Sequence, residues 1–228
     1  MTMNIFRLAG DMCHVFSIII LLLRLRVVKN AQGISCRTHE LFLLVFVTRY
    51  LDLFTKFYSL YNSCMKVLYI ATTASVINTI RFREPIASTY DRTQDSFLHW
   101  KFAVLPCVIV AVITHLIQAT RLYDMIDLLW TFSIYLEAIA ILPQLIVLQR
   151  YREVENLTGN YIFFMGAYRA LYILNWIYRA HHEAYYQHHF VVYFCGVLQT
   201  LLYVDFFYYY VKSKAKGGKL TLPTTHTT

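Results

Sequence analysis

The chain has 228 residues, of which 58% are hydrophobic and 15% charged, and its formal net charge is +8. Soluble globular domains are closer to half apolar and a quarter charged, so the composition excludes an ordinary soluble protein and indicates a multi-span membrane protein. Because no hydrophilic segment is long enough for a second domain, we expect one transmembrane domain over residues 1–211 and a polar tail over 212–228.

Seven apolar stretches are long enough to cross a bilayer. A hydrocarbon core of about 30 Å requires about 20 residues of α-helix. The predicted spans lie near residues 5–23, 40–57, 65–82, 102–119, 126–148, 158–178 and 190–211. The sequence therefore predicts an all-α membrane protein with seven transmembrane helices.

Two basic clusters set the expected orientation. They are Arg24, Arg26, Lys29 and Arg37 after the first span, and Lys212, Lys214, Lys216 and Lys219 in the tail. Positive residues concentrate in cytosolic loops, so both clusters are expected in the cytosol. With an odd number of spans, the N-terminus is then lumenal and the C-terminus cytosolic.

Polar residues recur at helical spacing within four of the spans. Residues three, four, seven and eleven apart share one face of a helix. The aligned sets are Arg7, Asp11 and His14; Arg49, Asp52 and Lys56; Asp127, Trp130 and Glu137; and Tyr168, Tyr172, Asn175 and Arg179. A charge at the bilayer centre costs about 2.5–3.5 kcal/mol, so we expect these faces to line a water-filled cavity rather than face lipid.

The charges allow two interpretations. They could form ion pairs that only join helices, for example Arg49 with Asp52 one turn away, or they could bind a ligand. Four aligned faces favour a ligand. Cations at the lumenal mouth with Arg49 deeper suit an elongated anion, because arginine binds a carboxylate through two parallel hydrogen bonds. Asp127 beside Trp130 offers a place for a cation on the same ligand.

Histidines and cysteines are the candidate proton switches and metal ligands of the sequence. Histidine ordinarily titrates near neutral pH, so His14 is the candidate proton switch, although it could also be a neutral histidine bonded within the core. The lumenal histidines are His181, His182, His188 and His189. They lack convincing ligand spacing, and the five cysteines lack Cys-x-x-Cys spacing, so neither a metal nor a cofactor is expected.

Several long stretches are specific enough to indicate a family. They are MNIFRLAGDMCH, VTRYLDLFTKFYSLYNS, LLWTFSIYLEAIAILPQL, NLTG, GAYRALYILNWIYR and DFFYYY, followed by KLTLP in the tail. These stretches resemble the KDEL receptors, the endoplasmic-reticulum protein-retaining receptors, with the plant-like branch nearest. The resemblance implies a fold similar to SWEET and PQ-loop transporters, in which a linker helix joins two three-helix bundles. Pro143-Gln144 matches the PQ pair of that fold.

The resemblance implies a retrieval receptor. Such receptors bind the C-terminal Lys/His-Asp-Glu-Leu signal of escaped endoplasmic-reticulum proteins in the Golgi and return them in retrograde coatomer vesicles, releasing them at neutral pH. By resemblance, Arg49 and Tyr50 hold the ligand's terminal carboxylate. The remaining ligand contacts implied are Arg7 and Arg179 for its acidic side chains, and Trp176 and Asp127 for its first residue.

Further roles follow from the same resemblance. His14 is the implied proton sensor, and Glu137 with Tyr168 is the implied hydrogen-bonded lock of the bound state. The supporting polar residues of the cavity are Asp52, Trp130, Arg169 and Asn175. The implied coatomer-binding residues are Lys212, Lys214, Lys216 and Lys219. Asp205 is a candidate trafficking residue as a regulatory charge, although it could equally belong to the interfacial aromatic belt. On composition alone, the lysines equally suit a flank beside acidic lipid headgroups.

The chain departs from the family pattern at a few positions, and an alternative function stays open. It has Asp127 in place of a glutamate, Gly218 in place of a lysine, and Gln187 in place of an acid. The alternative is a small-solute transporter on the same scaffold, favoured by the PQ pair and the polar cavity. The absence of Gly-x-Ser-x-Gly and His-Glu-x-x-His motifs argues against an enzyme.

Overall fold

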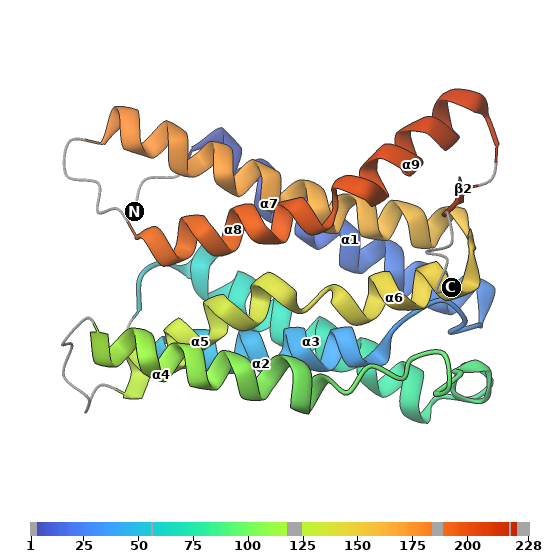
Figure 1. Cartoon of the computed structure of the whole chain (residues 1–228), viewed down its shortest axis with the longest axis horizontal. Coiled ribbons are helices and arrows are strands. Elements are labelled where there is room, and N and C mark those ends of the chain that lie inside the picture. Colours follow the sequence, from blue (N-terminus) through green and yellow to red (C-terminus); the bar gives the residue numbers. More distant parts are fainter. Residues whose placement is uncertain (1–3, 56, 118–124, 184–188, 219, 223–228) are drawn as a thin grey trace. The chain divides into compact units, whose positions relative to one another are not determined.

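The computed structural model describes residues 4–55, 57–117, 125–183, 189–218 and 220–222, most of them helical. The helices are α1 (Ile5–Val28), α2 (Cys36–Arg49), α3 (Leu60–Phe82), α4 (Leu105–Ile117), α5 (Met125–Ile139), α6 (Leu142–Tyr151), α7 (Asn156–His182), α8 (Phe190–Leu202) and α9 (Val204–Lys216). Figure 1 shows these helices. Two short strands, β1 (Glu153–Val154) and β2 (Leu220–Thr221), pair antiparallel. The prediction of an almost wholly helical chain is confirmed.

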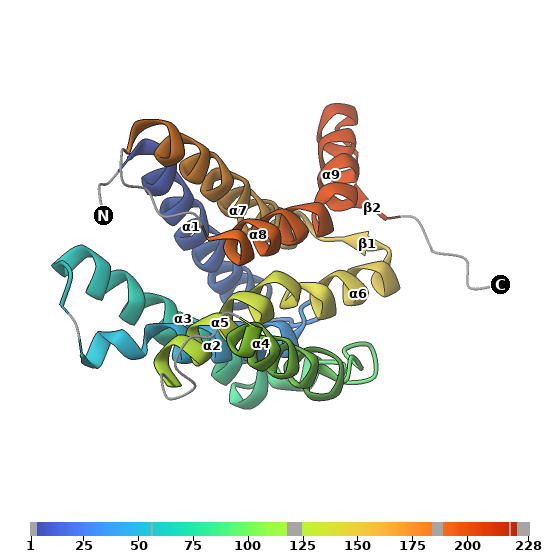
Figure 2. The same ribbon diagram turned by 60° about the vertical axis from the view of Figure 1, so that its left-hand side comes forward.

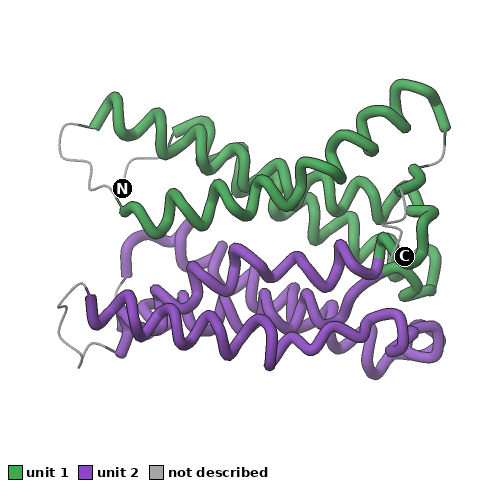
Figure 3. The backbone as a smooth tube through the Cα atoms, in the orientation of Figure 1, with its two compact units in different colours: residues 1–33, 148–228 green, residues 34–147 purple. Residues whose placement is uncertain are grey.

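The chain divides into two compact units, which Figure 3 shows in different colours. Unit 1 comprises residues 1–33 and 148–228, and unit 2 comprises residues 34–147. Unit 1 therefore contains α1 together with α7, α8 and α9, whereas unit 2 contains α2 to α5. The layout of two three-helix bundles with a linker helix stays a prediction.

Several helices are suited to a bilayer. Among the described residues, three helical segments are long and apolar enough to cross it: Ile5–Val28, Trp100–Ile117 and Met125–Tyr151. Helices α8 and α9 form a fourth candidate, bent by 41° at a short break. Helices α2, α3 and α7 overlap predicted spans. Helix α2 has only 14 residues, and α3 and α7 carry more polar side chains. The count of seven spans stays a prediction.

Helices α1 and α7 form the main packed pair of unit 1, and they run side by side in Figures 1 and 2. Both helices are capped by side chains. Asn4 accepts the backbone N–H of Arg7 at 2.9 Å at the start of α1, and Glu155 accepts two N–H groups at the start of α7. A side-chain cap satisfies backbone donors that the first helical turn leaves unpaired.

Helix α2 is the core helix of unit 2 and packs against α3 and α5. Its residues Leu41, Phe42, Val45 and Phe46 are all at least 98% buried. They recur every three to four positions, which places them along one face of the helix. Ser35 caps α2 through its hydroxyl, which accepts the backbone N–H of Thr38 at 3.1 Å.

Two predicted continuous helices are interrupted. The helix predicted over 40–57 ends at Arg49, and a 3₁₀ helix follows over Tyr50–Phe54. Thr48 donates its hydroxyl to the carbonyls of Leu44 and Val45, a bond that bends helices. The helix predicted over 126–148 breaks between α5 and α6, just before Pro143. Proline has no N–H and collides with the preceding turn.

Part of the predicted polar tail is folded. Helix α9 extends to Lys216 and ends at Gly217, whose φ of 62° lies in the left-handed region that glycine adopts without strain. Strand β2 then pairs with β1, and Leu222 donates its N–H to the carbonyl of Arg152 at 3.0 Å. The chain around residues 220–222 is thereby tied to the segment between α6 and α7.

Candidate functional site

The guanidinium of Arg49, in unit 2, is held by α5 through three hydrogen bonds. It donates through Nη1 to Glu137 Oε2 at 2.5 Å, through Nε to Ser133 Oγ at 3.0 Å and through Nη2 to the Ser133 carbonyl at 2.9 Å. The side chains of Arg49 and Glu137 are only 16% and 5% exposed. The end of α2 thus presents a buried cation that α5 neutralises and orients.

Asp52 does not serve as an ion partner of Arg49 within one helix. The 3₁₀ turn after Arg49 redirects Asp52, whose carboxylate accepts Lys66 Nζ of α3 at 2.7 Å. Lys66 also lies 5.5 Å from the centre of the Tyr50 ring, and that ring stacks on Phe46. The helical alignment predicted for residues 49, 52 and 56 is therefore wrong at Asp52, which lies in the 3₁₀ helix. Lys56 lies outside the described residues, so its alignment stays a prediction.

The predicted acidic and aromatic pair lies at the beginning of α5. Asp127 is exposed in the first turn of the helix, where a negative charge is favourable next to the helix N-terminus. Trp130 is half-buried one turn later, and its carbonyl accepts the Ser133 hydroxyl at 2.6 Å. Ser133 thereby links Trp130 to Arg49 within unit 2.

In unit 1, the polar faces predicted for α1 and α7 face each other. The Tyr172 hydroxyl donates to Asp11 Oδ1 at 2.5 Å, and the Asn4 amide donates to Asn175 Oδ1 at 2.6 Å. Both Asp11 and Asn175 are buried. Gly10 allows this approach, because a Cβ atom there would lie 2.9 Å from the Tyr172 ring.

His14 lies deeper in the same interface of α1 and α7. Its ring is parallel to the ring of Tyr168, with centroids 4.5 Å apart, and both residues are at least 95% buried. Arg169 donates Nη2 to the Tyr168 hydroxyl at 3.1 Å, and its guanidinium carbon lies 5.1 Å from the centre of the ring. A positive charge gained by His14 would therefore act directly on the stacked tyrosine.

The remaining unit 1 positions lie toward the beginning of α1 and the end of α7. Arg179 donates Nε and Nη2 to the two oxygens of Glu183 at 2.9 and 2.7 Å, a two-pronged bond to a carboxylate. Trp176 packs between Tyr172 and Tyr193, next to Gly196. Arg7 is half-buried on α1.

The structure thus groups the predicted residues into two clusters, one in each unit. Unit 1 holds Arg7, His14, Tyr168, Arg169, Asn175, Trp176 and Arg179; unit 2 holds Arg49, Tyr50, Asp52, Asp127, Trp130 and Glu137. The predicted lock pair, Glu137 and Tyr168, has one member in each unit. Gln187, which stands in place of an acid of the family pattern, lies outside the described residues.

Comparison with known proteins assigns the family. A family model described as "ER lumen protein retaining receptor" matches residues 30–179. An ER lumen protein-retaining receptor B of Arabidopsis thaliana is 50% identical over 221 residues, which are 97% of this chain and 100% of the relative. The ER lumen protein-retaining receptor 2 of Homo sapiens is 46% identical over the same shares of both chains.

The chain belongs to the ER lumen protein-retaining receptor family. This confirms the resemblance to the KDEL receptors, and plant relatives include a Petunia hybrida receptor that is 49% identical over 97% of this chain and 100% of its own length. The matched region contains both Arg49 with its partner Glu137 and the stacked residue Tyr168.

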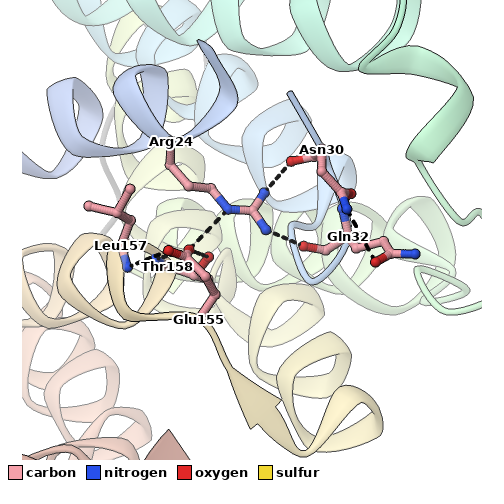
Figure 4. Close-up of polar contacts among 6 residues, drawn as sticks. All are labelled: Arg24, Asn30, Gln32, Glu155, Leu157 and Thr158. Atoms are coloured by element: carbon pink, nitrogen blue, oxygen red, sulfur yellow. Dashed lines mark hydrogen bonds and ion pairs between the residues drawn. The ribbon is translucent and has the colours of Figure 1, made fainter. Parts of the chain in front are cut away.

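A polar network around Arg24 holds unit 1 of the receptor together, and Figure 4 shows it in detail. Arg24 is only 4% exposed; it donates Nε to Glu155 at 3.3 Å and its two Nη atoms to the carbonyls of Asn30 and Gln32, each at 2.6 Å. In the sequence, Arg24 indicates only the orientation of the chain in the membrane. The carboxylate partner was not predicted because it lies 131 positions away.

Gln144 of the PQ pair has a structural role in this receptor. Its side-chain carbonyl accepts the N–H of Ser35 at 2.9 Å, and its own N–H donates to the Thr38 hydroxyl at 2.9 Å. All three residues are essentially inaccessible to solvent. Gln144 therefore fixes the start of α2 to the start of α6, so that α2 presents Arg49 at its other end.

The predicted trafficking residues lie on α9. Asp205 is exposed in the first turn, and Lys212, Lys214 and Lys216 are exposed toward its end. Lys212 lies over the Tyr208 ring and Lys214 over the Tyr210 ring, with nitrogen-to-centroid distances of 5.4 and 5.5 Å. Lys219 lies outside the described residues.

Proposed function

We propose that this receptor binds the C-terminal Lys/His-Asp-Glu-Leu signal of soluble endoplasmic-reticulum proteins that have reached the Golgi, and returns them to the endoplasmic reticulum. The names of its relatives, which describe retention of lumenal proteins, support this proposal. The observation that carries the chemistry is the Arg49 guanidinium, which α5 holds in one orientation through three hydrogen bonds. The family match favours this function over a small-solute transporter.

The Arg49–Glu137 bond suggests how the carboxylate of the signal binds. Arg49 already pairs with a carboxylate inside the receptor, so its geometry suits an arriving one. We assign the terminal carboxylate to Arg49 and Tyr50. The ligand carboxylate then replaces Glu137 on Arg49, and Glu137 becomes available to Tyr168 as the lock of the bound state.

The remaining assignments follow the charges of the signal. Arg7 and Arg179 receive the acidic side chains, with Arg179 exchanging its two-pronged bond to Glu183 for the ligand. Trp176 and Asp127 receive the basic first residue. Asp52, Trp130, Arg169 and Asn175 support this arrangement through their contacts within each unit.

The proposed pH dependence rests on His14. Protonation would place a positive charge between α1 and the stacked Tyr168, in a buried region where charges interact strongly. In the acidic Golgi this charge favours the anionic ligand, and in the neutral endoplasmic reticulum its loss releases the ligand. By linkage, proton binding and peptide binding then strengthen each other by equal factors.

The return of the cargo to the endoplasmic reticulum is assigned to residues on the cytosolic side of the membrane. We propose that the N-terminus is lumenal and that Asp205 and the lysines of α9 and the tail present a coatomer signal in the cytosol. The exposure of Lys212, Lys214 and Lys216 on α9 supports this assignment. The receptor would thus reside in endoplasmic-reticulum and Golgi membranes.

Peptide binding to the purified receptor tests the proposal. A peptide ending in Lys-Asp-Glu-Leu is titrated at pH ~5.5 and ~7.4, values on either side of an ordinary histidine pKa. The control is the same peptide with an amidated C-terminus. We expect binding at the acidic pH that is lost on amidation; equal binding of the amidated peptide would contradict the role of Arg49, and no binding at either pH would contradict the proposed function.

A further inference from the structure

A basic cavity in unit 2 is separate from the residues assigned to the peptide. It has a volume of about 440 Å³, which falls within the range of ligand-binding pockets. It lies between the beginning of α2, the end of α3 and the loop that precedes α4. The cationic residues that line it are Arg37, Arg81, Arg92 and Lys101.

The cavity carries excess positive charge. Glu40 is the acidic residue among its described lining, and it is already bonded to Arg81 and lies 3.2 Å from His99 Nε2. Arg37 donates its guanidinium to the carbonyl of Phe97. Arg92 and Lys101 are exposed and form no ion pair with a carboxylate among the described residues. Two cations are therefore available to an anionic ligand.

The loop that carries Arg92 is held in place by its own carboxylates. Asp95 is buried and accepts the hydroxyls of Ser35 at 2.8 Å and Tyr90 at 2.6 Å. Burial, followed by this bond to Asp95, raises the pKa of Tyr90 well above its ordinary value. Asp91 accepts the hydroxyl and N–H of Thr93, which lowers its pKa. The acids of the loop thus maintain its shape rather than neutralise Arg92.

The cavity adjoins a helix that suits a lipid environment. Trp100, which is 65% exposed, lines the cavity and also begins the apolar segment Trp100–Ile117. Tryptophan is enriched where a membrane helix leaves the hydrocarbon core. Beyond it, α4 exposes an apolar face that includes Leu105, Ile109 and Ile113. Basic side chains and an acyl-chain surface therefore adjoin each other.

We propose that this cavity binds the phosphorylated headgroup of an anionic phospholipid, a phosphoinositide, with its phosphates on Arg92 and Lys101 and its acyl chains along α4. Basic pockets at the ends of membrane helices recognise such headgroups through charge. Arginine adds two-pronged hydrogen bonds to phosphate. The proposal does not depend on peptide binding.

The test uses the full-length receptor in neutral detergent with dioctanoyl phosphatidylinositol 4-phosphate, and follows binding by the shift in melting temperature. We expect a saturable rise with this lipid and none with dioctanoyl phosphatidylcholine. An equal shift with both lipids would overturn the proposal, even without any variant. Inositol 1,4-bisphosphate, which lacks acyl chains, forms the third arm; binding as tight as that of the lipid would replace the lipid by a soluble phosphate.

Two matched variants locate the site. Arg92→Gln/Lys101→Gln removes the two available cations and should weaken lipid binding at least about tenfold. Arg26→Gln/Lys29→Gln removes the same charge from exposed positions at the C-terminal end of α1 and should leave binding unchanged. If lipid binding weakened equally in both variants, the lipid would be attracted by the overall positive charge of the protein, and the proposed site would be overturned. Unchanged melting temperatures without lipid confirm that both variants are folded.

Discussion

The Arg49 guanidinium of α2 and the Glu137 carboxylate of α5 form an ion pair at 2.5 Å that is almost closed to water. Removing one partner of a buried pair leaves an uncompensated charge. Arg49→Ala should therefore lower the free energy of unfolding by about 3–5 kcal/mol. Arg49→Ala/Glu137→Gln should recover part of that loss, as measured by thermal or denaturant unfolding in detergent. A double variant that is less stable by the sum of both single losses would contradict this coupling.

The pH response of peptide binding should disappear in His14→Phe. Phenylalanine retains a ring for the stack on Tyr168 but cannot bind a proton. We expect affinities at pH ~5.5 and ~7.4 to agree within about twofold, because the unperturbed histidine pKa lies between these values. Isothermal titration at the two pH values measures this. A variant with the pH response of the wild type would move the sensor to another residue.

Glu183→Gln should strengthen peptide binding slightly. Glu183 occupies both donors of Arg179 that we assign to the ligand. Exposed pairs of this i,i+4 kind contribute about 0.3–0.5 kcal/mol; because the side chains of Arg179 and Glu183 are only 13% and 27% exposed, the expected gain is at least about twofold. Glu153→Gln, an exposed acid of β1, is the matched control. The gain should vanish with a peptide ending in Lys-Asn-Gln-Leu; a gain that persists there would refute competition for Arg179.

The Arg24–Glu155 network should make stability depend on acidic pH. Burial by itself would raise the pKa of Glu155. The N–H groups of Leu157 and Thr158 and the Arg24 guanidinium stabilise the ionised carboxylate more strongly than burial destabilises it, and they hold the pKa below 4.5. A carboxyl with a lowered pKa stabilises the fold above its unfolded-state pKa, and this contribution is lost as the pH falls through the folded-state pKa. The melting-temperature difference between wild type and Glu155→Gln should therefore shrink below pH 4.5. A constant difference would contradict the role of ionised Glu155.

Gly196→Ala should displace Trp176. A Cβ atom at position 196 would lie 2.5 Å from Cζ3 of the indole, so the ring or α8 must move. Overpacking of this kind typically costs about 1–3 kcal/mol. We expect a lower melting temperature and weaker binding of peptides with a basic first residue. Gly218→Ala, where no atom lies within 4 Å of the added Cβ, is the control and should be neutral.

The sequence by itself determined the polar faces of α1 and α7. Asp11, His14, Tyr168 and Tyr172 were aligned from their spacing alone, and the structure brings these faces together. This succeeds because the α-helical period is local, so spacing along the chain fixes which residues share a face. The helical spacing of polar residues likewise predicts a polar environment for Arg49.

Only the tertiary structure decided which charges meet. The helical spacing allows a pair between Arg49 and Asp52. In the structure, however, Asp52 pairs with Lys66 and Arg49 pairs with Glu137, because α2 ends at Arg49 and a 3₁₀ helix follows. Arg24 and Glu155 are likewise neighbours only through the packing of α1 on α7. The strength of an ion pair depends on the distance between the two charges. Helix periodicity does not give that distance for residues on different helices. The distance depends on how helices that are far apart in sequence pack and on where each helix ends.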